Sequence, residues 1–369
     1  MNREPRRPKH AEIFADLHAA IRRGEIREGR RVPSENEIAA RYGASRPTAA
    51  RALRDLERMG LVERRVGSGT FVRRSEVPSG SLFGLLIPGL GTTEIFEPIC
   101  GEIARELHRR GHTLLWGDAA AGRGNPDPGL EDLCRHYVER RIAGVFFAPL
   151  ELRADKDPAN LRVAERLAAA GIAMILLDRD LVPFPERSRY DLVAIDHRRA
   201  GTVLARHLLG LGARRIDFAA RPLSAPTVDL RLAGVHDALR QAGILPRPDW
   251  VHLGDPEDAS FLRRLAADRA IEAVICANDV TAGHLLHGLE RAGRRVPRDV
   301  RVVGFDDVKY ARLLRVPLTT YRQPCEEIGA AAVSAMMERV TRPGRPGRDV
   351  LLDGELVVRQ SCGATPRGR

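Results

Sequence analysis

Hydrophobic residues near the start of the chain recur three or four positions apart and then give way to a short alternating stretch. The spacing predicts three helices, over residues 10–23, from Ser34 and from Ser45, each with one apolar face. Ser34 and Ser45 are good N-cap residues, and Glu37 completes a capping box with Ser34. Residues 61–72 alternate between apolar and polar positions around a Gly-Ser-Gly turn, which predicts a β-hairpin. We therefore expect a small domain of three helices closed by a hairpin.

The pattern changes at residue 82, where continuous apolar runs begin to alternate with amphipathic helical segments. Strands that are apolar on both sides, each followed by a helix, are typical of parallel sheets covered by helices on both faces. The alternation pauses at a Pro- and Arg-rich stretch over residues 182–189, where we expect the chain to pass from one Rossmann-like lobe to a second. The predicted fold class is α/β, with a winged helix-turn-helix over 1–74, a polar linker over 75–81 and a two-lobed domain over 82–369.

The charge of the chain is concentrated in its first part. The whole sequence has a formal net charge of +11, of which +8 lies in residues 1–74 and +3 in the remaining 295 residues. A basic domain on a nearly neutral body is typical of a protein that binds the phosphate backbone of nucleic acid. An arginine-rich composition is the alternative explanation, but it accounts for the number of arginines and not for their uneven distribution.

The third predicted helix carries polar and basic residues in its first turns. Ser45, Arg46, Thr48 and Arg51 lie near its N-terminus, while its alanine and leucine residues form the buried face. In a helix-turn-helix the N-terminal end of the second helix enters the major groove, where arginine and hydroxyl side chains contact bases and phosphates. Taken alone, the same residues are also compatible with an ordinary capped helix whose arginines are solvated.

Residues 10–74 resemble the DNA-binding domain of GntR-type winged-helix regulators. The segment VPSENEIAARYGASRPTAARALRDLERMGLVERRVGSGTFV, residues 32–72, follows the motif of that family nearly throughout. The match includes the P-S-E start of the second helix, the S-R-x-T turn, the L-x-x-x-G-L-V step and the G-x-G-T-F-V wing. The resemblance implies that this domain binds DNA through the following residues: Ser34, Glu35, Ser45, Arg46, Thr48, Arg51, Gly67, Gly69 and Thr70.

Polar side chains follow several predicted strands of the two-lobed part. Asp178 and Arg179 come after one strand, and Asp196, Asn278 and Asp306 come after three others. In open α/β sheets ligands bind beyond the carboxyl ends of the strands, and carboxylate and amide groups are suited to the hydroxyl groups of a sugar. The alternative for each of these aspartate and asparagine residues is that it caps the helix that follows.

Residues 82–363 resemble the effector domain of LacI/GalR-type regulators, which is similar to a periplasmic sugar-binding protein. The matching segments include DLVAIDHRRAGTVLARHLLGLGARRI, RLAGVHDALRQAGI and VICANDVTAGHLLHGLERAGRRVPRDVRVVGFDD. The family commonly has asparagine where this chain has His197. The strand ends, the resemblance and the loop before the first long helix together give the expected effector contacts: Thr92, Glu94, Phe96, Asp178, Arg179, Asp196, Arg231, Asn278, Asp306 and Gln323. Joined to the winged helix, the domain is similar to that of arabinose-responsive repressors of the GntR type.

The sequence carries few signs of other chemistry. No apolar run is long enough to span a membrane, the N-terminus lacks the apolar stretch of a secretory signal, and the five cysteines form no CxxC pair. We therefore expect a reducing, cytoplasmic location. Walker A, GxSxG and HExxH motifs are absent, so we expect no catalytic residues, no cofactor and no metal.

These patterns predict a ligand-responsive, DNA-binding transcription regulator that represses carbohydrate-use genes. We expect a homodimer on an inverted-repeat operator, with a small sugar or sugar derivative between the lobes altering DNA binding. The alternative is a sugar-binding or sugar-handling protein, or an enzyme, with an incidental basic N-terminal domain, and turnover of a bound sugar would favour it.

Overall fold

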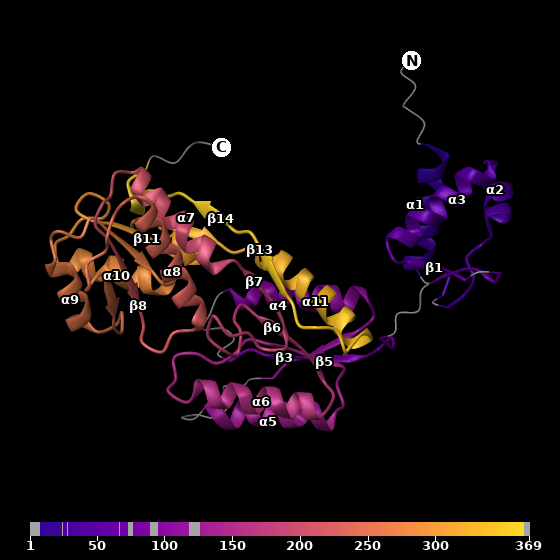
Figure 1. Cartoon of the computed structure of the whole chain (residues 1–369), viewed down its shortest axis with the longest axis horizontal. Helices are drawn as coiled ribbons and strands as arrows, with labels where there is room; N and C mark the ends of the chain where they lie inside the picture. The colour runs from indigo at the N-terminus through magenta and orange to yellow at the C-terminus, as the bar shows by residue number, and fades with distance from the viewer. Residues whose placement is uncertain are drawn as a thin grey trace, which may run out of the picture. The chain divides into compact units, whose positions relative to one another are not determined.

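The chain forms two compact units, Met1–Pro78 and Ser79–Arg369 (Figure 1). The structure is a computed structural model that describes residues 8–23, 25–27, 29–65, 67–72, 77–88, 95–117 and 126–364. The division falls within the segment 75–81, which the sequence pattern predicts to be a linker.

The first unit contains the three helices and the hairpin that the sequence predicts. They are α1 (Lys9–Arg22), α2 (Glu35–Tyr42), α3 (Arg46–Arg58), β1 (Val62–Arg65) and β2 (Gly69–Val72). Side chains from all five elements, among them Ile13, Ile38 and Leu56, form one buried core. Ser34 caps α2 in a capping box with Glu37, and Ser45 caps α3. The two caps satisfy backbone N–H groups at the helix starts, so the local sequence fixes where both helices begin.

A short segment before α2 extends the hairpin into a third strand. β1 and β2 pair antiparallel, and the chain before α2 lies on the other side of β2. Gly29 N donates to Val72 O (2.9 Å), and Val32 N donates to Thr70 O (2.8 Å). The hairpin is thereby tied to the start of α2, a pairing that so short a segment does not reveal by its own periodicity.

The second unit contains two lobes, each built on a six-stranded sheet. The strand order is β13-β7-β6-β5-β3-β4 in the first lobe and β14-β12-β11-β10-β8-β9 in the second. All neighbouring strands are parallel except β12 and β14. The elements of the first lobe are β3 (Leu82–Leu86), α4 (Phe96–Arg109), β4 (Thr113–Leu115), α5 (Pro126–Glu139), β5 (Gly144–Phe147), α6 (Lys156–Ala169), β6 (Ala173–Leu177), β7 (Asp191–Ile195), α11 (Cys325–Thr341) and β13 (Asp349–Leu352). Those of the second lobe are α7 (His197–Gly210), β8 (Ile216–Ala220), α8 (Pro226–Gln241), β9 (Val251–Leu253), α9 (Ala259–Ala267), β10 (Ala273–Cys276), α10 (Asp279–Arg291), β11 (Arg301–Asp306), η1 (Lys309–Arg312), β12 (Thr319–Arg322), β14 (Glu355–Val357) and η2 (Gln360–Cys362).

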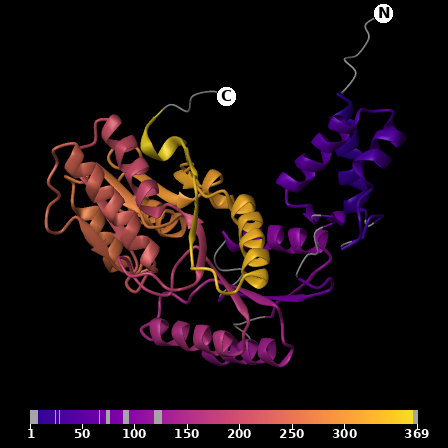
Figure 2. The same cartoon turned by 45° about the vertical axis from the view of Figure 1, so that its right-hand side comes forward.

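Helices cover both faces of each sheet, as the continuous apolar strands require. In the first lobe α5 and α6 pack on one face, while α4 and α11 lie together on the other (Figures 1 and 2). In the second lobe α9 and α10 share one core with the sheet, and α7 packs closely against α8. The fold is therefore an α/β domain of two parallel-sheet lobes, as predicted.

The expected change of lobe near residues 182–189 is wrong by one strand. That stretch is a loop between two strands of the same sheet, because β7 pairs in parallel with β6 through Ile175↔Asp191. The chain passes to the second lobe only after Ile195, returns with α11, and crosses again between β13 and β14. The polar composition of 182–189 marks an exposed loop, and composition alone does not distinguish a loop within a lobe from one between lobes.

Two glycines allow α7 and α8 to approach closely. A Cβ on Gly201 would overlap the backbone of Arg231, and a Cβ on Gly234 would overlap the carbonyl of Arg198. Any larger residue would push the helices apart. This contact brings His197, at the start of α7, within reach of Arg231 on α8.

Candidate nucleic-acid interface and ligand site

The N-terminal end of α3 presents polar and basic side chains on a buried apolar base. Thr48 N donates to Ser45 Oγ (3.4 Å), and the two hydroxyl groups share a hydrogen bond of 2.7 Å. Arg46 and Arg51 are exposed, while Ala49 and three further apolar residues of the helix are buried in the core. The unpaired N–H groups and the dipole of a helix start favour phosphate, so this end is suited to nucleic acid.

Glu35 connects the start of α3 to the hairpin. Its carboxylate accepts from Arg46 Nε (3.1 Å) and from Arg64 Nη2 (3.4 Å). The carboxylate thereby holds an arginine of α3 and an arginine of β1 toward one another. Ser34, the residue before it, is engaged in the capping box, where its N–H donates to Glu37 Oε2 at 2.7 Å. Arg64 is absent from the predicted contacts, because strict alternation along β1 puts it on the same side as Val62, which is buried. In the structure Arg64 is exposed.

The hairpin turn depends on two glycines with left-handed backbone. Gly67 has φ of 74° and Gly69 has φ of 112°, values that favour glycine strongly. A Cβ on Gly69 would lie 2.8 Å from Arg31 Nε, so the Arg31 side chain packs directly against this glycine. Thr70, the next predicted contact, is half-buried on β2. The hairpin therefore forms a wing, with Arg64 on β1 and Arg31 on the segment at the other side of β2.

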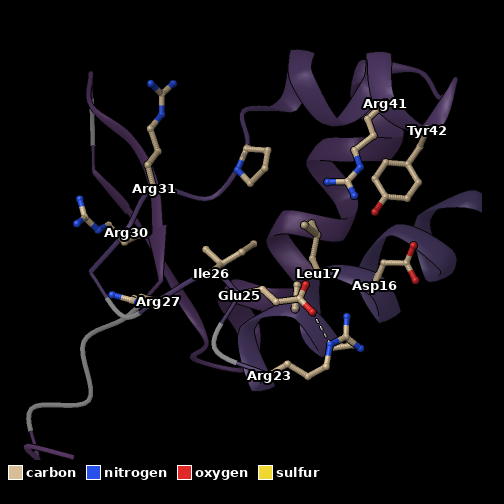
Figure 3. Close-up of a pocket in the computed structure, with 13 residues that line it drawn as sticks. Asp16, Leu17, Arg23, Glu25, Ile26, Arg27, Arg30, Arg31, Arg41 and Tyr42 are labelled. Carbon is tan, nitrogen blue, oxygen red and sulfur yellow. Dashed lines mark hydrogen bonds and ion pairs between the residues drawn. The ribbon is translucent and has the colours of Figure 1, made fainter.

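A basic pocket of about 790 Å³ lies in the same unit, between the C-terminal part of α1, the segment before α2 and the end of α2 (Figure 3). Its charged lining residues are Arg23, Arg27, Arg30, Arg31, Arg41, Asp16 and Glu25. Arg23 Nε pairs with Glu25 Oε1 at 2.7 Å, and none of the other four arginines is ion-paired to a residue that the structure describes. With five arginines against two carboxylates, the pocket carries part of the excess positive charge of this unit.

Five of the predicted effector contacts converge in the second unit. Asp178 and Arg179 follow β6 of the first lobe, Arg231 lies on α8 of the second lobe, and Asp306 and Gln323 end β11 and follow β12. All five side chains are buried or nearly so. Parallel strands bring their carboxyl ends to one edge of a sheet, which is why residues from distant parts of the chain meet here.

A chain of polar contacts joins these residues across the two lobes. His197 Nε2 lies 3.2 Å from Asp178 O and 3.4 Å from the Asp178 carboxylate. Arg231 Nε donates to His197 Nδ1 (3.2 Å), and Arg231 Nη2 lies 3.4 Å from Asp306 Oδ1. Gln323 Nε2 donates to the same carboxylate oxygen at 2.8 Å. Because Nδ1 of His197 accepts from arginine, its Nε2 carries the proton toward Asp178.

Arg179 has carboxylate partners on both sides. Its Nη1 lies 2.6 Å from Glu151 Oε1, and its Nε lies 3.3 Å from Asp178 Oδ2. The guanidinium carbon is 5.8 Å from the ring centre of Phe96, which is buried at the start of α4. Glu151 is a partner that the sequence reasoning missed. Glu151 lies four residues after the end of β5, in the loop that leaves the carboxyl end of that strand. Polar residues anywhere in such loops, and not only directly after the strand, are therefore candidate contacts.

The buried charges shift the pKa values of the two strand-end aspartates in opposite directions. Burial works to raise the pKa of Asp178, but the His197 hydrogen bond and the charges of Arg179 and Arg231 lower it below its usual range. Burial raises the pKa of Asp306, although Arg231 and Gln323 offset part of this effect. The site therefore holds a firmly ionised carboxylate on the first lobe and a more basic one on the second.

Strained backbone marks the same strand ends. Asp178 has φ of 67°, Asp306 has φ of 109° and Asp307 has φ of 54°, all in the region that non-glycine residues seldom adopt. Such conformations persist where the surrounding structure requires them and are frequent at ligand sites.

Asp196 and Asn278 have the capping role that the sequence left open as the alternative. Asp196 Oδ1 accepts from Arg199 N at the start of α7, and Asn278 Oδ1 accepts from Thr281 N at the start of α10, each at 2.9 Å. Thr92 and Glu94 lie outside the described residues. Of the predicted effector contacts, the buried group therefore contains Phe96, Asp178, Arg179, Arg231, Asp306 and Gln323.

Two further properties concern the part of the chain that the structure describes. No helix there is long and apolar enough to cross a membrane. The described residues also contain no group of three or more His, Cys, Asp or Glu side chains placed to hold a metal ion.

Comparison with known proteins gives both units a counterpart. Residues 9–72 match the family "Bacterial regulatory proteins, gntR family", and residues 205–362 match the "Periplasmic binding protein-like domain". The HTH-type transcriptional regulator MalR of Streptomyces coelicolor is 30% identical over 90% of this chain and 98% of its own. The arabinose metabolism transcriptional repressor of Geobacillus stearothermophilus is 28% identical over 96% of this chain and 97% of its own. A solved structure described as a transcriptional regulator CelR–cellobiose complex superimposes with a TM-score of 0.65, covering 89% of this chain and 100% of that chain at 24% identity.

Proposed function

The chain belongs to the HTH-type transcriptional regulators that join a gntR-family DNA-binding domain to a periplasmic-binding-protein-like domain, and on this premise we propose that its effector is a neutral, hydroxyl-rich sugar. As a member of this class it is a ligand-responsive, DNA-binding regulator of transcription. The sugar binds among the buried strand-end residues of the two lobes and changes the affinity of the winged helix for operator DNA.

The balance of charge at the buried group supports a neutral ligand. Arg179 is paired with Glu151 and Asp178, and Arg231 is paired with Asp306. Two guanidinium groups thus face three carboxylates, which leaves no uncompensated cation in this group to bind a phosphate. Carboxylate oxygens accept from sugar hydroxyl groups, and guanidinium and amide groups donate to them. The paired arginines are the observation that carries this proposal.

Related proteins point to the same class of ligand. One relative is named for arabinose metabolism, and one similar structure is described as a complex with cellobiose. Phe96 lies against Arg179, so an apolar ring borders the polar groups, as is usual in sites that bind small molecules.

The regulator works as a homodimer that represses carbohydrate-use genes. Two copies of the winged helix read the two halves of an inverted repeat, because a two-fold protein matches a two-fold operator. The sugar binds one arrangement of the lobes better than the other and shifts the population toward it, which alters the spacing of the paired DNA-binding domains. The protein acts in the cytoplasm, where its operator is.

The proposal is tested by isothermal titration of the purified protein with pentoses, hexoses and disaccharides, and in parallel with their phosphate esters. Neutral sugars should include a binder, and the same sugar should change the affinity for operator DNA selected from genomic fragments. A phosphate ester that binds at least about tenfold more tightly than its parent sugar would overturn the proposal, since it would require a free cation in the site.

We expect the protein to release the bound sugar without converting it chemically. A regulator uses only the binding free energy of its ligand, and this is checked by chromatography of the sugar after prolonged incubation with the protein. Conversion of the sugar would instead favour a sugar-handling enzyme with a basic N-terminal domain.

A further inference from the structure

The two lobes are joined by direct contacts at a place remote from the chain crossings. Leu152, after β5 of the first lobe, donates its N–H to Leu223 O, after β8 of the second lobe, at 2.8 Å. Ala225 N, in the same loop of the second lobe, donates to Glu151 Oε2 at 3.2 Å. We call Glu151, Leu152, Leu223 and Ala225 the cross-lobe latch.

Both leucines of the latch hold a backbone conformation that L-residues seldom adopt. Leu152 has φ of 59° and Leu223 has φ of 60°. Their side chains gain little from burial, since the two residues are 39% and 51% exposed. Packing of the leucine side chains therefore does not account for the conformation, whereas the hydrogen bond between their backbones does. Strain of this kind persists only where the surrounding structure imposes it.

Each side of the latch is anchored within its own lobe. Asn160 on α6, which is buried, accepts from Leu150 N (2.7 Å) and donates to Leu150 O (3.1 Å). On the other side Ser224 Oγ donates to Arg221 O at 2.8 Å. The two loops are thus prepared to meet, and their contact depends on the position of one lobe relative to the other.

Glu151 belongs both to the latch and to the proposed ligand site. One carboxylate oxygen lies 2.6 Å from Arg179 Nη1, and the other accepts from Ala225 N of the second lobe. Arg179 is itself held by Asp178 and lies against Phe96. A displacement of Arg179 therefore moves the carboxylate that holds the second lobe.

We propose that Glu151 is a positioning residue that links Arg179 to closure of the two lobes through the cross-lobe latch. The identity of the ligand at Arg179 rests on the proposed function. The connection from Arg179 through Glu151 to the second lobe does not depend on it. When Arg179 is held in place, Glu151 is oriented to receive Ala225 N, and the closed arrangement is favoured. When Arg179 is displaced, Glu151 is released and both hydrogen bonds between the loops weaken.

A second cross-lobe ion pair supplies a matched control. Lys309 Nζ, on η1 of the second lobe, lies 2.9 Å from Glu97 Oε2, on α4 of the first lobe. These side chains are 76% and 49% exposed, so water screens the pair. Glu97→Gln removes a carboxylate that also spans the lobes and leaves the contacts of Glu151 intact.

The test is hydrogen exchange of the backbone amides of Leu152 and Ala225 in the full-length protein without ligand. Glu151→Ala should speed exchange at Ala225 by about tenfold, because the acceptor is lost. It should also speed exchange at Leu152, whose own acceptor is untouched, because the lobes separate more often. Arg179→Lys should have the same two effects, since a lysine cannot reproduce the geometry of a guanidinium group. Glu97→Gln should leave both amides within about twofold of wild type.

Two results would overturn the proposal. The first is an unchanged Leu152 exchange rate in Glu151→Ala, which would make Glu151 a local contact and not a link to closure. The second is an unchanged Ala225 exchange rate in Arg179→Lys, which would disconnect the site from the latch. The amide of Ile275 in the buried strand β10 reports whether each variant is folded. Since no sugar is added, a failure of the sugar titrations would leave this result unaffected.

Discussion

Arg231 Nε donates to Nδ1 of His197 over 3.2 Å, so an arginine on α8 determines which nitrogen of the histidine carries its proton. His197 Nε2 then faces the backbone oxygen of Asp178 in the other lobe at 3.2 Å. The histidine is a bridge between the lobes, and its orientation is set by the residue expected to contact the ligand.

Replacing His197 should weaken ligand binding and the fold together. His197→Ala leaves Arg231 Nε buried without its acceptor, which should lower the free energy of unfolding by about 1–3 kcal/mol. The affinity for the sugar should fall by about tenfold or more for the same reason. Urea denaturation and isothermal titration measure the two effects. His287→Ala, at an exposed position on α10 of the second lobe, is the control. An equal loss in that variant would contradict a bridging role for His197.

Removing Arg46 should weaken DNA binding far more than removing an arginine from the other end of α3. Arg46→Ala deletes a side chain at the predicted contact surface and should cost about 1–3 kcal/mol of operator binding. Arg58 lies in the last turn, is exposed and pairs with Asp55, so Arg58→Ala should change affinity by less than about twofold. Fluorescence anisotropy at several salt concentrations measures both. Equal losses for the two variants would indicate general electrostatics and no specific contact.

Asp279 should make stability depend on pH above the range in which an ordinary aspartate titrates. Burial, together with the charge of Asp306, raises the pKa of Asp279 well above its usual range. A group whose pKa is raised in the folded state stabilises the fold fully below its unfolded pKa, about 3.9, and this contribution is lost as pH rises through the folded pKa. The free energy of unfolding should therefore fall by up to about 1.4 kcal/mol per pH unit between these two pKa values.

Urea denaturation of wild type and Asp279→Asn at a series of pH values checks this dependence. The asparagine variant has no proton to lose and should show a flatter profile, with Asp132→Asn, an exposed substitution on α5, following the wild type. Parallel profiles for wild type and Asp279→Asn would show that Asp279 does not cause the pH dependence of the free energy of unfolding.

Gly234 should tolerate no side chain. Gly234→Ala would place a Cβ into the carbonyl of Arg198 and force α7 and α8 apart, at a cost of about 3 kcal/mol in unfolding free energy. Because His197 and Arg231 lie on these helices, the variant should also lose ligand affinity. Gly210→Ala is the control, since its Cβ would enter open space and should stabilise α7 by up to about 1 kcal/mol. Thermal unfolding distinguishes them, and comparable stability of the two variants would contradict the tight contact.

The parts of the structure that the sequence predicts are those set by local chemistry. Ser34 and Ser45 cap the helices that their positions suggested, because a cap depends only on the next three residues. The continuous apolar runs likewise predict parallel sheets. The return of α11 to the first lobe had no local signal, since pairing over a long sequence distance leaves no periodicity in the segment itself.

The sequence predicts that a ligand site lies at the strand ends, but it predicts less well which residues belong to that site. Four polar residues stand at the ends of strands: Asp178, Asp196, Asn278 and Asp306. The sequence cannot separate the two that cap helices from the two that face the buried group. The backbone distinguishes them, because Asp178 and Asp306 have positive φ. The sequence does not predict the role of Glu151, because that role depends on Ala225, which lies in another loop and in the other lobe.

The three crossings between the lobes restrict how they can move. The strands on either side of the third crossing, β13 and β14, pair with β7 and β12, the strands that precede the other two crossings, so all three lie at one edge of the two sheets. Two bodies joined by several short connections along one edge keep essentially one degree of freedom, a rotation about that edge. The cross-lobe latch lies inward from it, at β5 and β8, and therefore acts on a long lever arm. A single hydrogen bond at that distance resists a much larger torque than the same bond beside the axis.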